Sequence, residues 1–133
     1  MKKVLKRDDL VYPELSYEII GCAYEVCNKL GGGLHEKYYQ KGMAVEFELK
    51  GWKFKEQAYF PLEYKGKIIG KSFLDFLVDD KIIVEIKKDT RFSKEHIDQV
   101  NNYLKVTGLK LALLINFSGK EVFHTRILNI NSN

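Results

Sequence analysis

The sequence predicts an α/β fold of the mixed α+β type, in which a mixed β-sheet is flanked by helices. Two observations lead to this prediction. Apolar side chains recur at helical spacing over residues 14–30, whereas residues 52–87 contain strand-length runs rich in β-branched and aromatic residues. A chain of 133 residues fits one domain covering 1–133, and its charged beginning, residues 1–13, is expected to be loosely ordered.

Two helices are expected before the first strand. The first, over residues 14–30, should end at Gly31-Gly32-Gly33, because glycine supplies the positive φ that a C-cap and a tight turn require. The second helix is expected over residues 35–50, before Gly51.

Five strands and one more helix complete the order α, α, β, β, β, α, β, β. Pro61 suggests that the first strand lies at an edge or contains a bulge. Ser93 is a suitable N-cap for a helix over 94–106, and Gly108 stops that helix. The fourth strand is a nearly continuous apolar run, which is typical of burial on both faces. The strands are expected at residues 52–64, 68–78, 82–87, 109–117 and 121–128.

Composition narrows the class of protein. The net charge of +4 is compatible with a polyanionic partner but is also common among ordinary enzymes. No apolar run approaches the roughly 18 residues that cross a bilayer, and the first residues lack the features of a signal peptide. Cys22 and Cys27 would lie about 140° apart around one helix, which disfavours a local disulfide. These observations predict a cytoplasmic protein with reduced thiols and no membrane contact.

The stretch KSFLDFLVDDKIIVEIKK, residues 71–88, places two acids inside predicted strands. If the hairpin turns at residues 79–81, Asp75 lies opposite Glu85, with Cβ atoms roughly 4.5–5.5 Å apart. Lys87 follows Glu85 by two and projects from the same face. The other face of the hairpin would then carry apolar side chains, namely Leu74, Phe76, Val84 and Ile86.

Two opposed carboxylates repel each other, and two interpretations account for them. In the first, the acids bind Mg²⁺ or Mn²⁺, which prefer hard oxygen ligands, and Lys87 stabilises charge on a phosphate or orients a water molecule. In the second, this face is solvated and Lys87 merely screens two surface acids. Because such spacings of charged residues are common, the hairpin by itself favours the second interpretation.

Three motifs occur in order along the chain. Residues 33–39, GLHEKYY, fit G-x-x-E-x-x-Y; Asp75 with residues 85–87, EIK, fits D…E-x-K; and residues 99–103, QVNNY, fit Q-x-x-x-Y. Together they resemble the GxxExxY protein family, a branch of the PD-(D/E)xK nuclease superfamily. The likeness extends from about residue 15 to residue 128.

This resemblance implies a restriction-endonuclease-like α-β-β-β-α-β core with an extra N-terminal helix. It also implies that Asp75 and Glu85 are the metal ligands, together with the backbone carbonyl of Ile86, and that Lys87 is the catalytic lysine. Glu36 would match the acid that many relatives place near the metal, as a catalytic residue and a candidate further ligand. The alternative for Glu36 is an ordinary first-turn acid favoured by the helix dipole.

By the same resemblance, Gln99 and Tyr103 would support the site or contact the DNA backbone; the alternative is a half-buried polar pair that only packs. His96 shares their face, and a solvated role is favoured for it. Basic residues between the site and the next helix could contact phosphates or form a solvated loop: Lys87, Lys88, Arg91 and Lys94.

The expected function is therefore metal-dependent hydrolysis of phosphodiester bonds in DNA by an endonuclease or exonuclease, with Mg²⁺ or Mn²⁺ as cofactor. The alternative is a non-catalytic module that binds nucleic acid or protein on the same fold. A homodimer would suit a small nuclease that must meet both strands, by analogy alone.

Overall fold

The computed structural model describes residues 11–89 and 92–130. Within them, every predicted element is present in the predicted order, and each boundary lies within two residues of the predicted one. The helices are α1 (Pro13–Leu30), α2 (Glu36–Lys50) and α3 (Lys94–Thr107), and the strands are β1 (Phe54–Tyr64), β2 (Lys67–Val78), β3 (Ile82–Lys87), β4 (Leu111–Ser118) and β5 (Glu121–Leu128).

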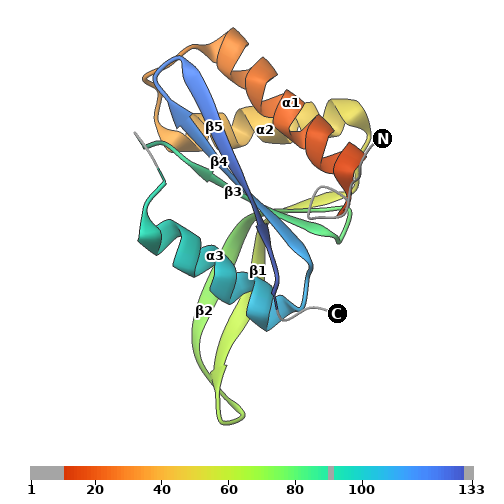
Figure 1. Ribbon diagram of the computed structural model, residues 1–133, viewed down its shortest axis with the longest axis vertical. Coiled ribbons are helices and arrows are strands. Elements are labelled where there is room, and N and C mark those ends of the chain that lie inside the picture. Colours follow the sequence, from red (N-terminus) through yellow and green to blue (C-terminus); the bar gives the residue numbers. More distant parts are fainter. Residues whose placement is uncertain (1–10, 90–91, 131–133) are drawn as a thin grey trace, which may run out of the picture.

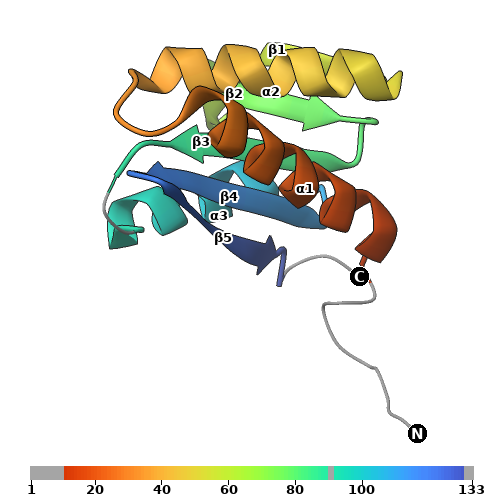
Figure 2. The ribbon, with the colours of Figure 1, turned by 90° about the horizontal axis from the view of Figure 1, so that it is seen from above.

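The strands form one sheet in the order β1-β2-β3-β4-β5 (Figure 1). Strands β3 and β4 are parallel and are joined through α3, whereas the other neighbours are antiparallel. Helices α1 and α2 pack on one face of the sheet and α3 packs on the other (Figure 2). The predicted mixed sheet flanked by helices, with an added N-terminal helix, is thus confirmed.

Strand β4 separates two apolar clusters. Leu111 and Leu113 belong to the α1/α2-side cluster, which includes Ile19, Met43, Phe47 and Phe76. Ala112 and Leu114 belong to the α3-side cluster, which includes Ile83, Val100 and Leu104. The strand is therefore buried on both faces, as its apolar run predicted.

Strands β1 and β2 change faces halfway along their length. Phe54 of β1 and Phe76 of β2 pack in the α1/α2-side cluster, but Ala58 and its cross-strand partner Leu74 pack in the α3-side cluster. Gln57, with a φ of 48°, interrupts the regular ladder between them. The prediction that Leu74 shares a face with Phe76 is therefore wrong, because this local turn of the strand pair breaks the two-residue alternation.

The beginning of the described chain is ordered by a distant contact. The guanidinium of Arg126 on β5 donates to the carbonyl oxygen of Val11 over 2.8 Å, and Val11 and Tyr12 pack against the α1/α2-side cluster. Pro13 then occupies the first helical turn, where its missing N–H costs nothing. Residues 11–13 thus contact the folded core, whereas residues 1–10, the rest of the segment expected to be loosely ordered, lie outside the described residues.

The three glycines after α1 have different roles. Gly31 and Gly33 have φ values of 76° and 85°, which favour glycine. Gly32 does not, but a Cβ atom there would collide with the backbone carbonyl of Gly119 in the β4–β5 turn. The turn between α1 and α2 is thus held against the end of the sheet.

We predict opposite effects for two glycine substitutions. Gly32→Ala should lower the free energy of unfolding by about 1–3 kcal/mol, because two backbone segments must separate. Gly21→Ala, in α1 with nothing within 4 Å of the added methyl group, should raise it by about 0.5–1 kcal/mol. Urea unfolding of both variants measures these changes, and a Gly32→Ala protein as stable as the wild type would contradict the close approach.

Candidate active site

The hairpin formed by β2 and β3 has the register expected from its turn. Phe76 pairs with Val84, Leu77 with Ile83, and Val78 with Ile82. Asp79 and Asp80 in the turn adopt positive φ angles of 54°, which acids with short side chains tolerate better than most residues. The next opposed residues along the hairpin are Asp75 and Glu85.

At Asp75 and Glu85, hydrogen bonds between backbone amides and side-chain carboxylates replace the backbone pairing of β2 with β3. The backbone N–H of Asp75 donates to Oε2 of Glu85, and the backbone N–H of Ile86 donates to Oδ2 of Asp75; both bonds are 2.7 Å long. Each acid is therefore anchored by an amide of the opposite strand. We call Asp75 and Glu85 the carboxylate pair.

The carboxylate pair is removed from water. Glu85 is only 3% exposed, and its burial, followed by the negative charge of Asp75, raises its pKa to about 8. Burial also raises the pKa of Asp75, although the N–H of Ile86 and the charge of Lys87 act in the opposite direction. The acids are thus poorly stabilised as anions by the protein alone, and the interpretation of two solvated surface acids does not fit this environment.

Two further predicted residues lie close enough to act on the carboxylate pair electrostatically. The half-buried Lys87 lowers both pKa values, and Glu36 raises both. Oε1 of Glu36 also accepts a 3.2 Å hydrogen bond from the backbone N–H of Lys88, so the first turn of α2 is tied to the end of β3. Within the described ranges, no three His, Cys, Asp or Glu side chains form a ready metal cage, and Glu36 does not complete one.

Tyr39 holds Glu36 at this position. Its buried hydroxyl donates to the carbonyl of Gly31 over 2.8 Å and accepts from the N–H of Leu34 over 3.2 Å, and its ring stacks on Phe117 of β4. The tyrosine of the G-x-x-E-x-x-Y motif thus fixes the entry to α2 through Gly31 and Leu34, while the motif glycine, Gly33, supplies a positive φ of 85° in the same turn.

Helix α3 closes the opposite side of the site. Burial raises the pKa of Tyr103 to about 12, and the negative charges of Glu85 and Asp75 add to this effect. Gln99 forms a side-chain hydrogen bond with Tyr103, whose ring packs edge-on against Phe60 at 4.9 Å. Tyr103 therefore lies near the carboxylate pair and also belongs to the core, whereas the exposed Gln99 is connected to the site through Tyr103.

Two polar residues near the site were missed by sequence reasoning. Gln57 of β1 hydrogen-bonds the carboxylate of Asp75, which lowers the pKa of that acid. Asn116 of β4 pairs with Lys87 and is fully buried; its Oδ1 accepts from the N–H of Asp89 at 2.7 Å, while its Nδ2 has no hydrogen-bond partner among the described residues. The sequence could have pointed to Asn116, because it is the only polar residue in the apolar run LLINF.

The predicted basic cluster is only partly described. Arg91 lies outside the described residues, Lys88 is exposed, and Lys94 forms a 2.9 Å ion pair with Asp98. His96 is not solvated as predicted: its side chain is 19% exposed, and its Nε2 lies 3.8 Å from Asp89. It therefore borders the β3–α3 connection.

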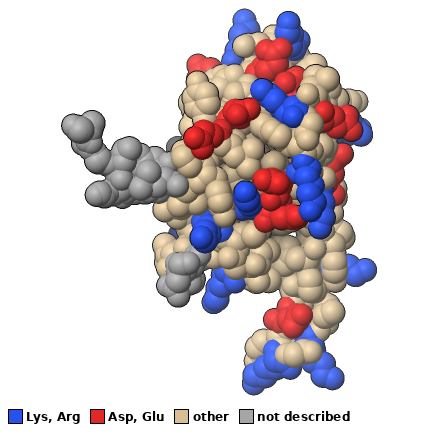
Figure 3. Space-filling model, turned by 90° about the vertical axis from the view of Figure 1, so that its right-hand side faces the viewer, with Lys and Arg blue, Asp and Glu red and all other residues tan. Residues whose placement is uncertain are grey.

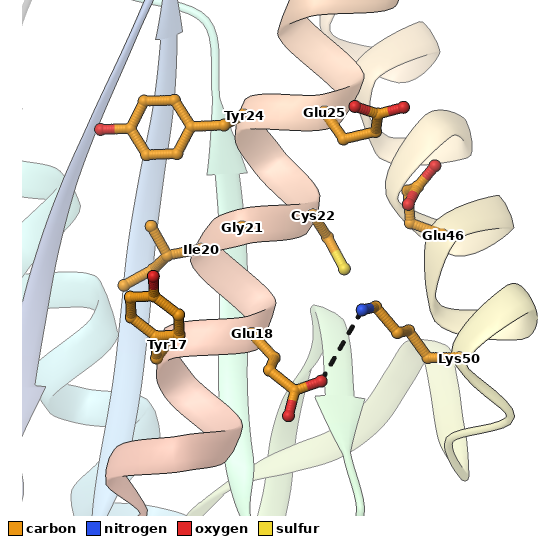
Figure 4. Close-up of a pocket in the computed structure, with 9 residues that line it drawn as sticks. All are labelled: Tyr17, Glu18, Ile20, Gly21, Cys22, Tyr24, Glu25, Glu46 and Lys50. Carbon is orange, nitrogen blue, oxygen red and sulfur yellow. Dashed lines mark ion pairs between the residues drawn. The ribbon is translucent and has the colours of Figure 1, made fainter.

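A separate hollow lies between α1 and α2 (Figure 4). Glu18 and Lys50 form a 3.7 Å ion pair across it, and Cys22 reaches it from α1. Burial raises the pKa of this thiol to about 11, so it remains protonated and is a poor nucleophile near neutral pH. Cys22 and Cys27 are both free, as their spacing predicted, and both are buried. None of the helices in the described ranges is both long and apolar enough to cross a membrane.

Comparison with protein families matches residues 13–127 to the PD-(D/E)XK nuclease superfamily. The chain belongs to this superfamily. Its members generally use divalent metals and act on nucleic acids. The matched range includes the carboxylate pair, Lys87 and the α3 residues Gln99 and Tyr103. A search of curated proteins found no match.

Two solved structures share the fold. The crystal structure of SSO0001 matches with a TM-score of 0.55 and 14% sequence identity. The match covers 90% of this chain but only 59% of the length of SSO0001. An alkaline exonuclease, LHK-Exo from Laribacter hongkongensis, matches with a TM-score of 0.51 and 17% identity over 96% of this chain and 72% of its own. At these identities the likeness establishes a nuclease fold and no substrate.

The raised pKa of Glu85 predicts a pH-dependent stability in a chelating buffer. Between the ordinary glutamate value of 4.5 and about 8, the folded state keeps a proton that the unfolded chain has released, so this group's contribution to stability falls as pH rises. Glu85→Gln should therefore gain melting temperature relative to the wild type across this window. Glu63→Gln, on the exposed hairpin, controls for the loss of one charge, and a constant difference between Glu85→Gln and wild type would contradict the prediction.

Proposed function

We propose that the protein is a metal-dependent nuclease that hydrolyses phosphodiester bonds in DNA, and that it belongs to the GxxExxY branch of its superfamily. The observation that carries this proposal is the buried carboxylate pair, anchored by reciprocal bonds to backbone amides beside Lys87. Strongly perturbed acids with a charged neighbour are typical of functional sites.

The residues present fit a divalent cation. Asp75 and Glu85 offer hard carboxylate oxygens in a place where their charges lack compensation. A strand residue directs its N–H and C=O toward the same neighbouring strand, so the carbonyl of Ile86 is directed toward the strand of Asp75 and would be a third ligand. Since no third acid within residues 11–89 and 92–130 completes a cage, the remaining positions would be left to water and phosphate oxygens. Mg²⁺ and Mn²⁺ suit this donor set.

Each residue then has a distinct task. A bound cation would polarise a phosphoryl oxygen and lower the pKa of a coordinated water. Lys87 would balance the negative charge that grows on the phosphate, or orient the attacking water. Glu36 would hold the backbone at Lys88 and thereby the end of β3. Gln99 and Tyr103 would form the wall of the site on the α3 side.

Cleavage assays test this proposal. With Mg²⁺ or Mn²⁺, the wild type should cleave at least one substrate among plasmid, single-stranded and branched DNA. Asp75→Asn and Lys87→Met should each lose at least about a hundredfold in rate, because single charge-stabilising groups commonly contribute that much. DNA affinity of Lys87→Met should stay within a few-fold, since one lost phosphate contact weakens binding only modestly.

Lys110→Met is the matched control, because Lys110 directly precedes β4 at the end of the sheet opposite Lys87 and its pairing partner Asn116. It should cleave like the wild type. If all variants bind DNA and the wild type cleaves none of the substrates, the protein is a non-catalytic binding module instead.

A further inference from the structure

The far half of the β1–β2 hairpin extends beyond the rest of the sheet. Strand β3 pairs with β2 only from Phe76 to Val78, so the earlier part of β2, from Lys67 onward, has β1 as its sheet neighbour in the described chain. Figure 1 shows this part of the hairpin projecting below the body of the molecule. It therefore has one edge and one face that the fold does not use.

One face of this projection is covered by the fold. Ala58, Phe60, Leu62 and Leu74 pack in or against the α3-side cluster. Because side chains alternate along a strand, the residues between them point the other way. That opposite face includes the cross-strand pairs Tyr59–Phe73 and Pro61–Lys71, and we call these four residues the hairpin platform.

The hairpin platform presents two aromatic rings side by side. Tyr59 and Phe73 are cross-strand partners with ring centroids 5.6 Å apart, and they are 51% and 48% exposed. Proteins seldom leave neighbouring large apolar groups in water unless they serve as a contact surface.

The charges around the hairpin platform favour an anionic partner. Residues 59–73 contain three lysines (Lys65, Lys67 and Lys71) and one acid (Glu63), which gives 3 − 1 = +2. Lys71 lies on the platform itself, opposite Pro61. Figure 3 shows basic side chains gathered at the end of the projection, at the bottom of that view. Apolar rings beside lysines match the bases and phosphates of a nucleic acid better than they match an acidic or a purely apolar protein surface.

The position of the rings connects them to the carboxylate pair. Phe73 precedes Asp75 by two residues on β2, which is about 7 Å along a strand and roughly the length of two stacked nucleotides. The platform faces away from α3, whereas the carboxylate pair lies near Tyr103 of α3, so a nucleic-acid strand that bound both would pass around the free edge of β2 between Asp75 and Phe73. Only unpaired bases expose their faces to such rings, because in a duplex the bases stack on one another.

We propose that the hairpin platform stacks unpaired bases, and hence that the substrate carries a single-stranded segment near the bond that is cut, reached around the free edge of β2. The reference to cleavage rests on the proposed function, whereas the stacking itself can be measured without cleavage. Lys71, Lys65 and Lys67 would contact the phosphates of the same strand.

Binding in a chelating buffer tests this proposal independently of catalysis. The probes are a labelled oligothymidylate of about 20 nucleotides, longer than the roughly 4–16 nucleotides that one such surface covers, and a blunt duplex of equal length. The wild type should bind the single strand more tightly than the duplex. Tyr59→Ala and Phe73→Leu should each weaken single-strand binding about tenfold, within the range of roughly 5- to 150-fold known for loss of one stacking ring, and should change duplex binding less than twofold.

Two controls separate stacking from folding. Phe73→Leu keeps the apolar contact without the ring, so normal binding by this variant would overturn the proposal. Tyr17→Ala removes a tyrosine from α1 that is 79% exposed, more than Tyr59, and should bind like the wild type. Preference of the wild type for the blunt duplex, binding to neither probe, or conversion of a dimer to a monomer by Phe73→Leu would each overturn it as well. Intact stacking without cleavage by the wild type would refute the nuclease function alone.

Discussion

The hydrogen bonds exchanged between Asp75 and Glu85 and the backbones of each other's strands are the constraint on which the site depends. They join β2 to β3 at the level where backbone pairing stops, just beyond Phe76 and Val84. The β1–β2 pair changes faces at the same level, so its far half leaves β3 and packs on α3 instead. One junction therefore determines both where the acids lie and where the hairpin projects.

This junction is electrostatically costly. Burial, followed by the charge of Asp75, raises the pKa of Glu85 to about 8; burial, with the charge of Glu36, also raises the pKa of Asp75, and the nearby Lys87 only partly offsets these effects. Two acids kept in such a place destabilise the fold relative to apolar residues of similar size. A cation held between them would supply the missing compensation, which connects the stability of this part of the sheet to the chemistry proposed for it.

The sequence predicted most of the fold because turn and helix-cap residues mark the ends of nearly every helix and strand. The register of the β2–β3 hairpin followed from the position of its turn and from the alternation of apolar residues. It could not predict the face of Leu74, because alternation assumes an uninterrupted strand and the interruption arises at Gln57 on the neighbouring strand. No role for Asn116 could be read from the apolar run of the fourth strand, because its hydrogen bond is to Asp89, which follows the neighbouring strand β3. The pairing of Tyr59 with Phe73, fourteen residues apart, likewise required the β1–β2 register.

The central claim is that Asp75 and Glu85 jointly bind a divalent cation, and diffraction from crystals grown with Mn²⁺ tests it most directly. The account predicts an anomalous peak between the two carboxylates, at about 2.1 Å from an oxygen of each and from the carbonyl of Ile86, and no such peak in Asp75→Ala. A wild-type crystal saturated with Mn²⁺ that shows no peak there would contradict the account, as would the same peak persisting in the variant.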